Sequence, residues 1–112
     1  MSNLANTNLV QLETKAEHVA SVLALMGNAR RLMILCRLVE GEASVGELAA
    51  YVGLGQSALS QHLARLREAG LVATRREAQS IFYSLASAEI RALMTTLYEV
   101  YCGPEARPDA GA

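Results

Sequence analysis

The sequence predicts a mainly α-helical domain that carries one β-hairpin, and three observations support this prediction. Apolar residues recur at steps of three and four in several segments, as they do along one face of a helix. A glycine-containing turn, Gly53-Leu54-Gly55, separates two of these segments. Residues 71–85 place β-branched and aromatic side chains on both sides of a polar EAQS, which is typical of a hairpin.

Two helices are expected ahead of the glycine turn and its short flanking helix. Over residues 9–26, apolar side chains follow a seven-residue spacing, which indicates a helix with a narrow apolar seam. Residues 29–39, ARRLMILCRLV, are apolar almost all round after the first turn, so we expect this helix at the centre of the core. The members of the seam are Leu9, Leu12, Ala16, Val19, Leu23 and Met26.

Capping residues set the limits of the remaining helices. Ser44 and Glu47 form a capping box ahead of a short helix over 45–52, and a second helix runs from Gln56 to Gly70. Ser87 is expected to cap a last helix whose apolar stripe continues to Val100. That stripe consists of Ile90, Leu93, Leu97 and Val100.

The length and composition allow one domain. At 112 residues, 52% of them hydrophobic, the chain can build a real core over 1–102, and the polar residues 103–112 are expected to form a disordered tail. The start, MSNLANTNLVQLE, lacks the basic end of a secretion signal, and the longest apolar run, LMILC, is too short to cross a membrane. Two cysteines in such a chain favour the reducing cytoplasm.

Charge is distributed unevenly, although the net charge is only −1. Residues 56–76 contain four arginines and one glutamate, whereas residues 77–112 contain two arginines and five acids. A basic middle followed by an acidic end is typical of a local nucleic-acid footprint. A solvated helix face gives the same pattern, so charge alone leaves both interpretations open.

The order of helix, tight turn, helix and hairpin predicts a winged helix-turn-helix, in which the second helix enters the major groove of DNA. That helix turns Leu59, Leu63 and Leu66 to the core, which leaves its polar side chains for base edges and phosphates. An ordinary amphipathic surface helix is the alternative. The candidate DNA contacts are Gln56, Ser57, Ser60, Gln61, His62 and Arg65 on this helix and Arg75 and Arg76 on the wing.

Positions 28–85 resemble the ArsR/SmtB family of small dimeric winged-helix repressors. The resemblance rests on SALSQHLARLREAGLV followed by RREAQSIFYSL, a combination more specific than a helix-turn-helix alone. It implies a homodimer formed through the N- and C-terminal helices, with double-stranded operator DNA as its partner. Gly55 departs from the family pattern, in which a serine usually caps the recognition helix, but glycine is a tolerable cap.

Most members of that family sense metals, so the metal-ligand positions can be compared. Arsenic and cadmium sensors carry cysteines in the pattern ELCxC, where this chain has ELAAY at 47–51. Zinc and nickel sensors carry Asp and His on the last helix, where this chain has neither, so no metal or other cofactor is expected. His18 is interpreted as a solvated or interface residue, and His62 as a packing residue or a phosphate contact.

The remaining reactive groups are Cys36 on the central helix and Cys102 at the end of the last helix. By themselves they could be a small buried hydrophobe and an inert surface thiol. Their placement and the wing sequence instead resemble the thiol-switch subgroup of the family, which responds to persulfides. That resemblance implies that reactive sulfur species link Cys36 to Cys102 through sulfur atoms, and that the operator is then released.

Three alternatives to a persulfide sensor remain open from the residues. The thiols could respond to peroxide or to general thiol oxidation, or they could be idle while an inducer binds elsewhere. A small thiol enzyme, such as a peroxidase or a sulfurtransferase, would need a base beside its nucleophile. Neither histidine is near a cysteine in the sequence, so an enzyme is not expected.

Overall fold

The computed structural model describes residues 2–102 of the chain, with side chains from residue 9 onward. It confirms the predicted winged helix-turn-helix, which is mainly α-helical with a small antiparallel sheet. The tail expected over 103–112 lies outside the described residues. The elements are, in order, α1 (Ser2–Met26), α2 (Ala29–Val39), β1 (Ala43–Ser44), α3 (Val45–Val52), α4 (Gln56–Glu68), β2 (Val72–Glu77), β3 (Ser80–Leu85) and α5 (Ala88–Cys102).

The core forms around α2, in agreement with the central position expected for this helix. Ile34, Leu35 and Leu38 of α2 are fully buried. The helix begins after Asn28, whose side chain accepts hydrogen bonds from two backbone N–H groups of the first turn. α3, α4 and α5 all pack against α2 and add aliphatic side chains to the same cluster. These side chains are Leu48, Val52, Leu59, Leu63, Leu66, Ile90 and Met94.

The helix-turn-helix consists of α3, the turn over 53–55 and α4. The predicted capping box is present: the Ser44 hydroxyl accepts a hydrogen bond from the Glu47 backbone N–H at 3.1 Å, and the Glu47 carboxylate accepts one from the Ser44 backbone N–H at 2.8 Å. α3 ends at Gly53, whose φ of 69° is a left-handed conformation that favours glycine. This conformation turns the chain sharply between α3 and α4.

Three antiparallel strands form the sheet in the order β1–β3–β2. β2 and β3 are the predicted hairpin, but Glu77 pairs with Ser80, so only Ala78 and Gln79 remain as the loop and the polar EAQS is only partly a turn. β1 was not expected from the sequence. It pairs with β3 over two residues only, which is too short to produce an alternating strand pattern.

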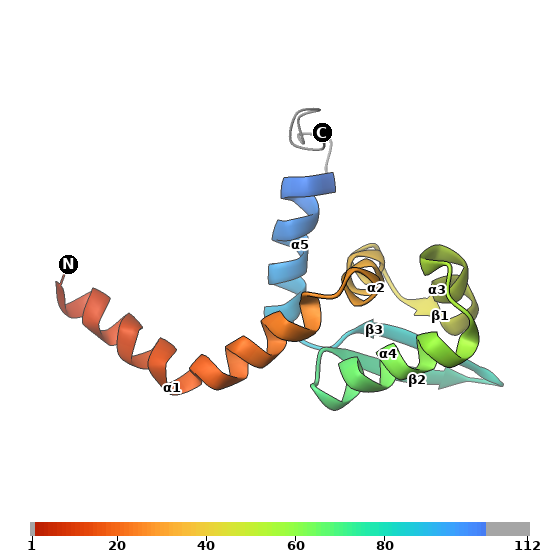
Figure 1. Cartoon of the computed structure of the whole chain (residues 1–112), viewed down its shortest axis with the longest axis horizontal. Coiled ribbons are helices and arrows are strands. Elements are labelled where there is room, and N and C mark those ends of the chain that lie inside the picture. Colours follow the sequence, from red (N-terminus) through yellow and green to blue (C-terminus); the bar gives the residue numbers. More distant parts are fainter. Residues whose placement is uncertain (1, 103–112) are drawn as a thin grey trace.

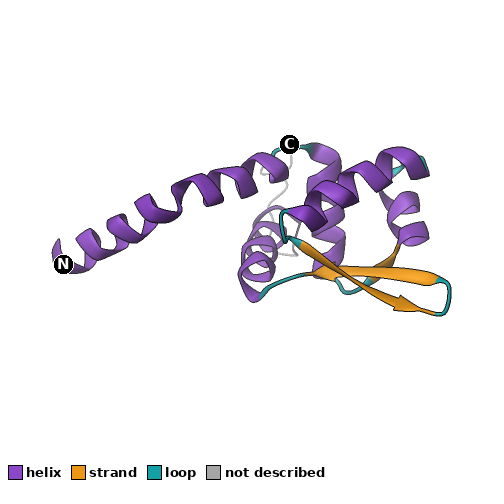
Figure 2. Cartoon of the chain, turned by 90° about the horizontal axis from the view of Figure 1, so that it is seen from below, coloured by secondary structure: helices purple, strands orange, loops and turns teal. Residues whose placement is uncertain are grey.

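The elements that bear the helix-turn-helix and the wing gather on one side, whereas α1 runs away from them and α5 packs on the side of α2 opposite α3 (Figure 1). Seen from below, the β2–β3 hairpin lies along the helical body, and its turn points away from the N-terminal end (Figure 2). Within residues 2–102, no single helix is long and apolar enough to cross a membrane. The segments 9–26 and 29–39 meet that length and composition test only as a pair, across a bend of 95°.

Replacing Ser44 with alanine is expected to lower the free energy of unfolding by about 1 kcal/mol at neutral pH, because it removes the hydroxyl half of the capping box. Denaturant unfolding followed by circular dichroism measures this. The hydrogen bond from the Ser44 backbone N–H lowers the pKa of Glu47. The carboxylate half of the box is therefore present above the ordinary pKa of a glutamate and is lost as the pH falls through the lowered value.

Gly55→Ser is the matched control for this prediction. Gly55 stands at the start of α4 without a side-chain cap, and nothing lies within 4 Å of a Cβ placed on it. A serine there should raise the free energy of unfolding by about 0.3 kcal/mol. Equal stability of the wild-type protein and the Ser44→Ala variant would show that the box contributes nothing to the fold.

Candidate nucleic-acid interface and thiol pair

Buried leucines fix the orientation of α4 on the core, so that its polar face is exposed. Leu59, Leu63 and Leu66 are each at most 2% exposed and anchor the helix to the core, as the sequence predicted. The opposite face carries short hydrogen-bonding side chains that can pair with base edges. Of the predicted contacts, Gln56, Ser57, Ser60 and Gln61 line one shallow hollow together with Ala64.

His62 lies at the border between that exposed face and the core. Its Nδ1 is 3.4 Å from Nη1 of Arg31, and because arginine is always a donor, the ring nitrogen acts as the acceptor. Burial, followed by the charges of Arg31 and the nearby arginines Arg65 and Arg30, lowers the pKa of His62. The imidazole is therefore neutral at physiological pH and joins α4 to α2.

Arg30 and Arg31 help to position the helix-turn-helix, which the sequence did not reveal. The Arg30 guanidinium donates to the backbone carbonyl of Val52 at the end of α3. Arg31 donates from Nε to the carbonyl of Leu25 in α1 at 2.8 Å. Both arginines thus satisfy carbonyl groups at helix ends. No local spacing marks these contacts, because each arginine reaches a different helix.

The arginines of the wing leave opposite faces of β2. In the strand register Arg75 lies opposite Phe82 and Arg76 opposite Ile81, so successive side chains alternate between the two faces. Arg75 forms ion pairs with Glu42 and Glu77. Arg76 is exposed and makes no ion pair within residues 9–102. Arg65 is also exposed, in the last turn of α4.

The two cysteines lie on helices that pack against each other, Cys36 on α2 and Cys102 at the end of α5. Both are free thiols; Cys36 is half-buried and Cys102 is exposed. Burial raises the pKa of Cys36, and the neighbouring charge of Cys102 raises it further. Nothing in the local sequence relates the two thiols; the packing of α5 on α2 brings their helices together.

A hydrogen bond joins α5 to Glu40, the residue that follows the end of α2. The Tyr98 hydroxyl donates to the Glu40 carboxylate at 3.3 Å. Glu40 follows Cys36 by four residues and Tyr98 precedes Cys102 by four. Each therefore lies about one helical turn from the cysteine of its own segment, on the same face. The charge of Glu40 raises the pKa of Tyr98, which keeps the phenol protonated and able to donate.

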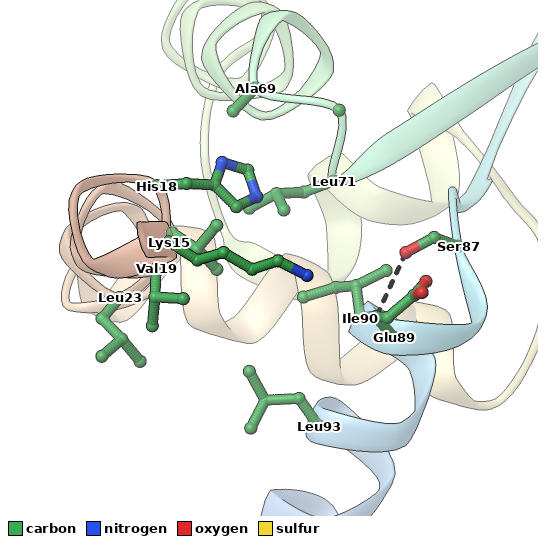
Figure 3. A pocket seen from close by; sticks show the side chains of 12 residues that line it. Lys15, His18, Val19, Leu23, Ala69, Leu71, Ser87, Glu89, Ile90 and Leu93 are labelled. Carbon is green, nitrogen blue, oxygen red and sulfur yellow. Dashed lines mark hydrogen bonds between the residues drawn. The ribbon is translucent and has the colours of Figure 1, made fainter. Parts of the chain in front are cut away.

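Apolar side chains remain uncovered on α1 and α5. In the predicted seam Leu9, Leu12 and Leu23 are each more than half exposed, and Val100 on the stripe of α5 is 54% exposed. The two helices and the turn between α4 and β2 border an open hollow, into which His18 and Lys15 project beside Val19, Leu23, Ile90 and Leu93 (Figure 3). His18 shares this hollow with apolar side chains and with the charged side chains of Lys15 and Glu89. Across the part of the chain that the structure describes, no three His, Cys, Asp or Glu side chains come together as metal ligands.

Comparison with known proteins agrees with this geometry. A model of the family "Bacterial regulatory protein, arsR family" matches residues 28–74. Transcriptional activator HlyU of Vibrio cholerae serotype O1 is 50% identical over 98 residues, which cover 88% of this chain and 91% of that protein. The solved structure of reduced HlyU from Vibrio cholerae N16961 aligns with a TM-score of 0.78 over 82% of this chain and 97% of that one.

Two further proteins extend the comparison. The biofilm growth-associated repressor of Xylella fastidiosa is 47% identical over 94 residues, 84% of this chain and 82% of that protein. A homodimeric winged helix-turn-helix DNA-binding domain, Mb0332 from Mycobacterium bovis, is 32% identical, with a TM-score of 0.71 over 79% of this chain and 82% of that one. These proteins are transcriptional regulators or DNA-binding domains and not enzymes.

Proposed function

The chain belongs to the arsR family of bacterial regulatory proteins, and from this membership we propose that it is a transcriptional repressor that releases its operator when reactive sulfur species link Cys36 to Cys102. The observation that carries the proposal is that Cys36 and Cys102 lie on two helices, α2 and α5, that pack against each other, away from the exposed face of α4. The solved relative described as reduced supports a role for the thiol state. Residues 1–102 act as one regulatory domain, in the cytoplasm, where the DNA is.

DNA binding places α4 in the major groove and the wing beside it. Gln61 and Gln56 can each form a two-point contact with adenine, and Ser57 and Ser60 can pair with several base edges. Arg65 and Arg76 supply charge for phosphates, with no sequence preference. His62 is neutral and bonded to Arg31, so its role is to hold α4 in place rather than to add charge.

The repressor works as a homodimer joined through α1 and α5. A stable chain of this size rarely leaves a long apolar seam in water, and Leu9, Leu12 and Leu23 of the α1 seam are exposed, although Met26 at its end is buried in the core. A second copy related by a two-fold axis would cover this seam and the hollow beside Leu93 at the same time. The homodimeric relative supports the same arrangement. Dimerisation also gives the two α4 helices the spacing of two operator half-sites.

Sedimentation equilibrium at micromolar concentration is expected to show a dimer. Leu93→Glu on α5 should shift the protein to monomers, because it places a charge in the apolar contact without a partner. Tyr51→Glu is the matched control: Tyr51 is 50% exposed on α3, outside the seam, and its replacement should leave the dimer intact. A monomeric wild-type protein under these conditions would contradict the proposed assembly.

The sensing chemistry needs no separate oxidant. Two persulfide donors, RSSH, in turn transfer their outer sulfur to the exposed Cys102, and each departs as the thiolate RS⁻. The Cys36 thiolate then attacks the central sulfur of the resulting hydrotrisulfide, forms a trisulfide bridge and expels hydrosulfide. The expelled hydrosulfide carries away the two electrons that the thiols lose. A longer bridge relaxes the Cα separation of about 4.4–6.8 Å that a direct disulfide demands.

Direct oxidation by peroxide is the second candidate, because a plain disulfide would join the same two packed helices, α2 and α5. Intact mass spectrometry after each treatment distinguishes the two. A persulfide sensor becomes heavier by one or more sulfur atoms and loses operator binding, whereas a peroxide sensor becomes lighter by two hydrogen atoms. If neither reagent changes operator affinity, the thiols are idle and an inducer acts elsewhere.

A further inference from the structure

Two carboxylates of the same chain hold the guanidinium of Arg75. Its Nε and Nη2 donate to the two carboxylate oxygens of Glu42 at 2.9 and 2.8 Å, and its Nη1 donates to Glu77 at 2.7 Å. The Nε–Nη2 edge is one that forms two-point pairs with anions, and it is occupied. A DNA phosphate would have to displace a carboxylate to form such a pair with Arg75.

These contacts run across the sheet. Arg75 on β2 lies opposite Phe82 on the central strand β3, and its guanidinium carbon is 4.8 Å from the centre of the Phe82 ring. Glu42 directly precedes β1, which pairs with the other edge of β3. The Arg75 side chain therefore passes from β2 over β3 to the beginning of β1.

The wing needs such an anchor because little else fixes its outer part. Residues 75–80 are all exposed, and the sheet joins the hairpin to β1 through two residues only. A hairpin without packing is marginally stable in water. The segment that carries Glu42 follows directly from α2, so the contact ties the wing to the central helix of the core.

We propose that Arg75 is a positioning residue, anchored by Glu42, that sets the orientation of the wing, and that Arg76 supplies the wing's phosphate contact. The alternation along β2 places Arg76 on the opposite face, where no carboxylate pairs with it within residues 9–102. The pKa shifts agree with this: the hydrogen bond from Arg75 lowers the pKa of Glu42, and the carboxylates raise that of Arg75. Of the two measurements below, operator affinity rests on the proposed DNA-binding function, whereas hydrogen exchange in the free dimer does not.

Arg75→Lys tests the proposal, since lysine keeps the charge but cannot form the two-point contact with Glu42. We expect faster amide hydrogen exchange over residues 72–85 of the free dimer. Operator affinity should fall about two- to fivefold per half-site, with an unchanged dependence on salt concentration. Arg76→Ala is the matched control, and we expect it to change the salt dependence of binding but not the hydrogen exchange. Its exchange should be unchanged, while the salt slope should fall by about 0.9 for each phosphate that the variant no longer neutralises.

Glu42→Gln should reproduce the effects of Arg75→Lys, and the two changes together should be no worse than either alone, because they remove one interaction. Normal exchange in Arg75→Lys would overturn the proposal. So would an Arg75→Ala variant that loses salt dependence as Arg76→Ala does, because Arg75 would then be a phosphate contact itself. If the wild-type dimer binds no DNA, the proposed function fails, but the exchange measurements still decide whether Arg75 anchors the wing.

Discussion

Alanine in place of Gln61 is expected to weaken binding to the preferred operator by about 1–3 kcal/mol, or roughly 5- to 150-fold, for each base that this side chain reads. Gln61 is exposed on α4 and lines the same hollow as Ser60. The buried leucines on the opposite face of the helix determine that its side chain points outward. An amide that pairs with one base loses both hydrogen bonds when it is truncated. Ser60→Ala should have a smaller effect of the same kind. Fluorescence anisotropy with the operator and with a scrambled duplex, at one salt concentration, measures both.

The scrambled duplex separates the reading of bases from simple attraction. Gln61→Ala should leave affinity for it almost unchanged, whereas Arg76→Ala should weaken both duplexes alike. Gln11→Ala, at an exposed glutamine on α1, controls for a general effect of the substitution. If neither Gln61→Ala nor Ser60→Ala changes operator affinity, an element other than α4 occupies the major groove.

The parts of the fold that were predictable from the sequence are those that local spacing determines. Leu59, Leu63 and Leu66 follow helical steps, so the buried and exposed faces of α4 could be assigned from the sequence. The capping box at Ser44 and the end of the short helix at the Gly53 turn depend on residues within one or two turns, and both were identified correctly; the left-handed conformation of Gly53 is seen only in the structure. The hydrophobic seam of α1 was also correct as a pattern, but its exposure shows only in the structure.

The remaining features depend on contacts between distant residues. β1 is two residues long and exists because β3 pairs with it, and its Ser44 also caps α3, which is the role that the sequence shows. The different surroundings of Arg75 and Arg76 depend on Glu42, which pairs with Arg75 from more than thirty positions away. In the sequence the two arginines are equivalent neighbours. The same holds for the thiols, whose relation follows from the packing of α5 on α2.

A serine at either Cys36 or Cys102 is expected to keep operator binding but to abolish release by a persulfide donor. Neither thiol lies on the exposed face of α4, so the loss of one sulfur should not change the base contacts. In the wild-type protein, the bridge joins the helix at the centre of the core to the proposed dimer helix and should weaken operator binding by about 5- to 150-fold. Anisotropy before and after treatment, with intact mass spectrometry on the same samples, measures both events.

The rate of bridge closure gives an independent check. Because burial and the charge of Cys102 raise the pKa of Cys36, only a small fraction of this thiol is the reactive thiolate at neutral pH. Closure should therefore accelerate as the pH rises toward that raised pKa and level off above it, while a Cys36→Ser variant should accumulate sulfur on Cys102 without closing the bridge. Single-serine variants that still leave the operator on persulfide treatment would show that the thiols are bystanders. The chain would then remain a DNA-binding regulator whose inducer acts through another site.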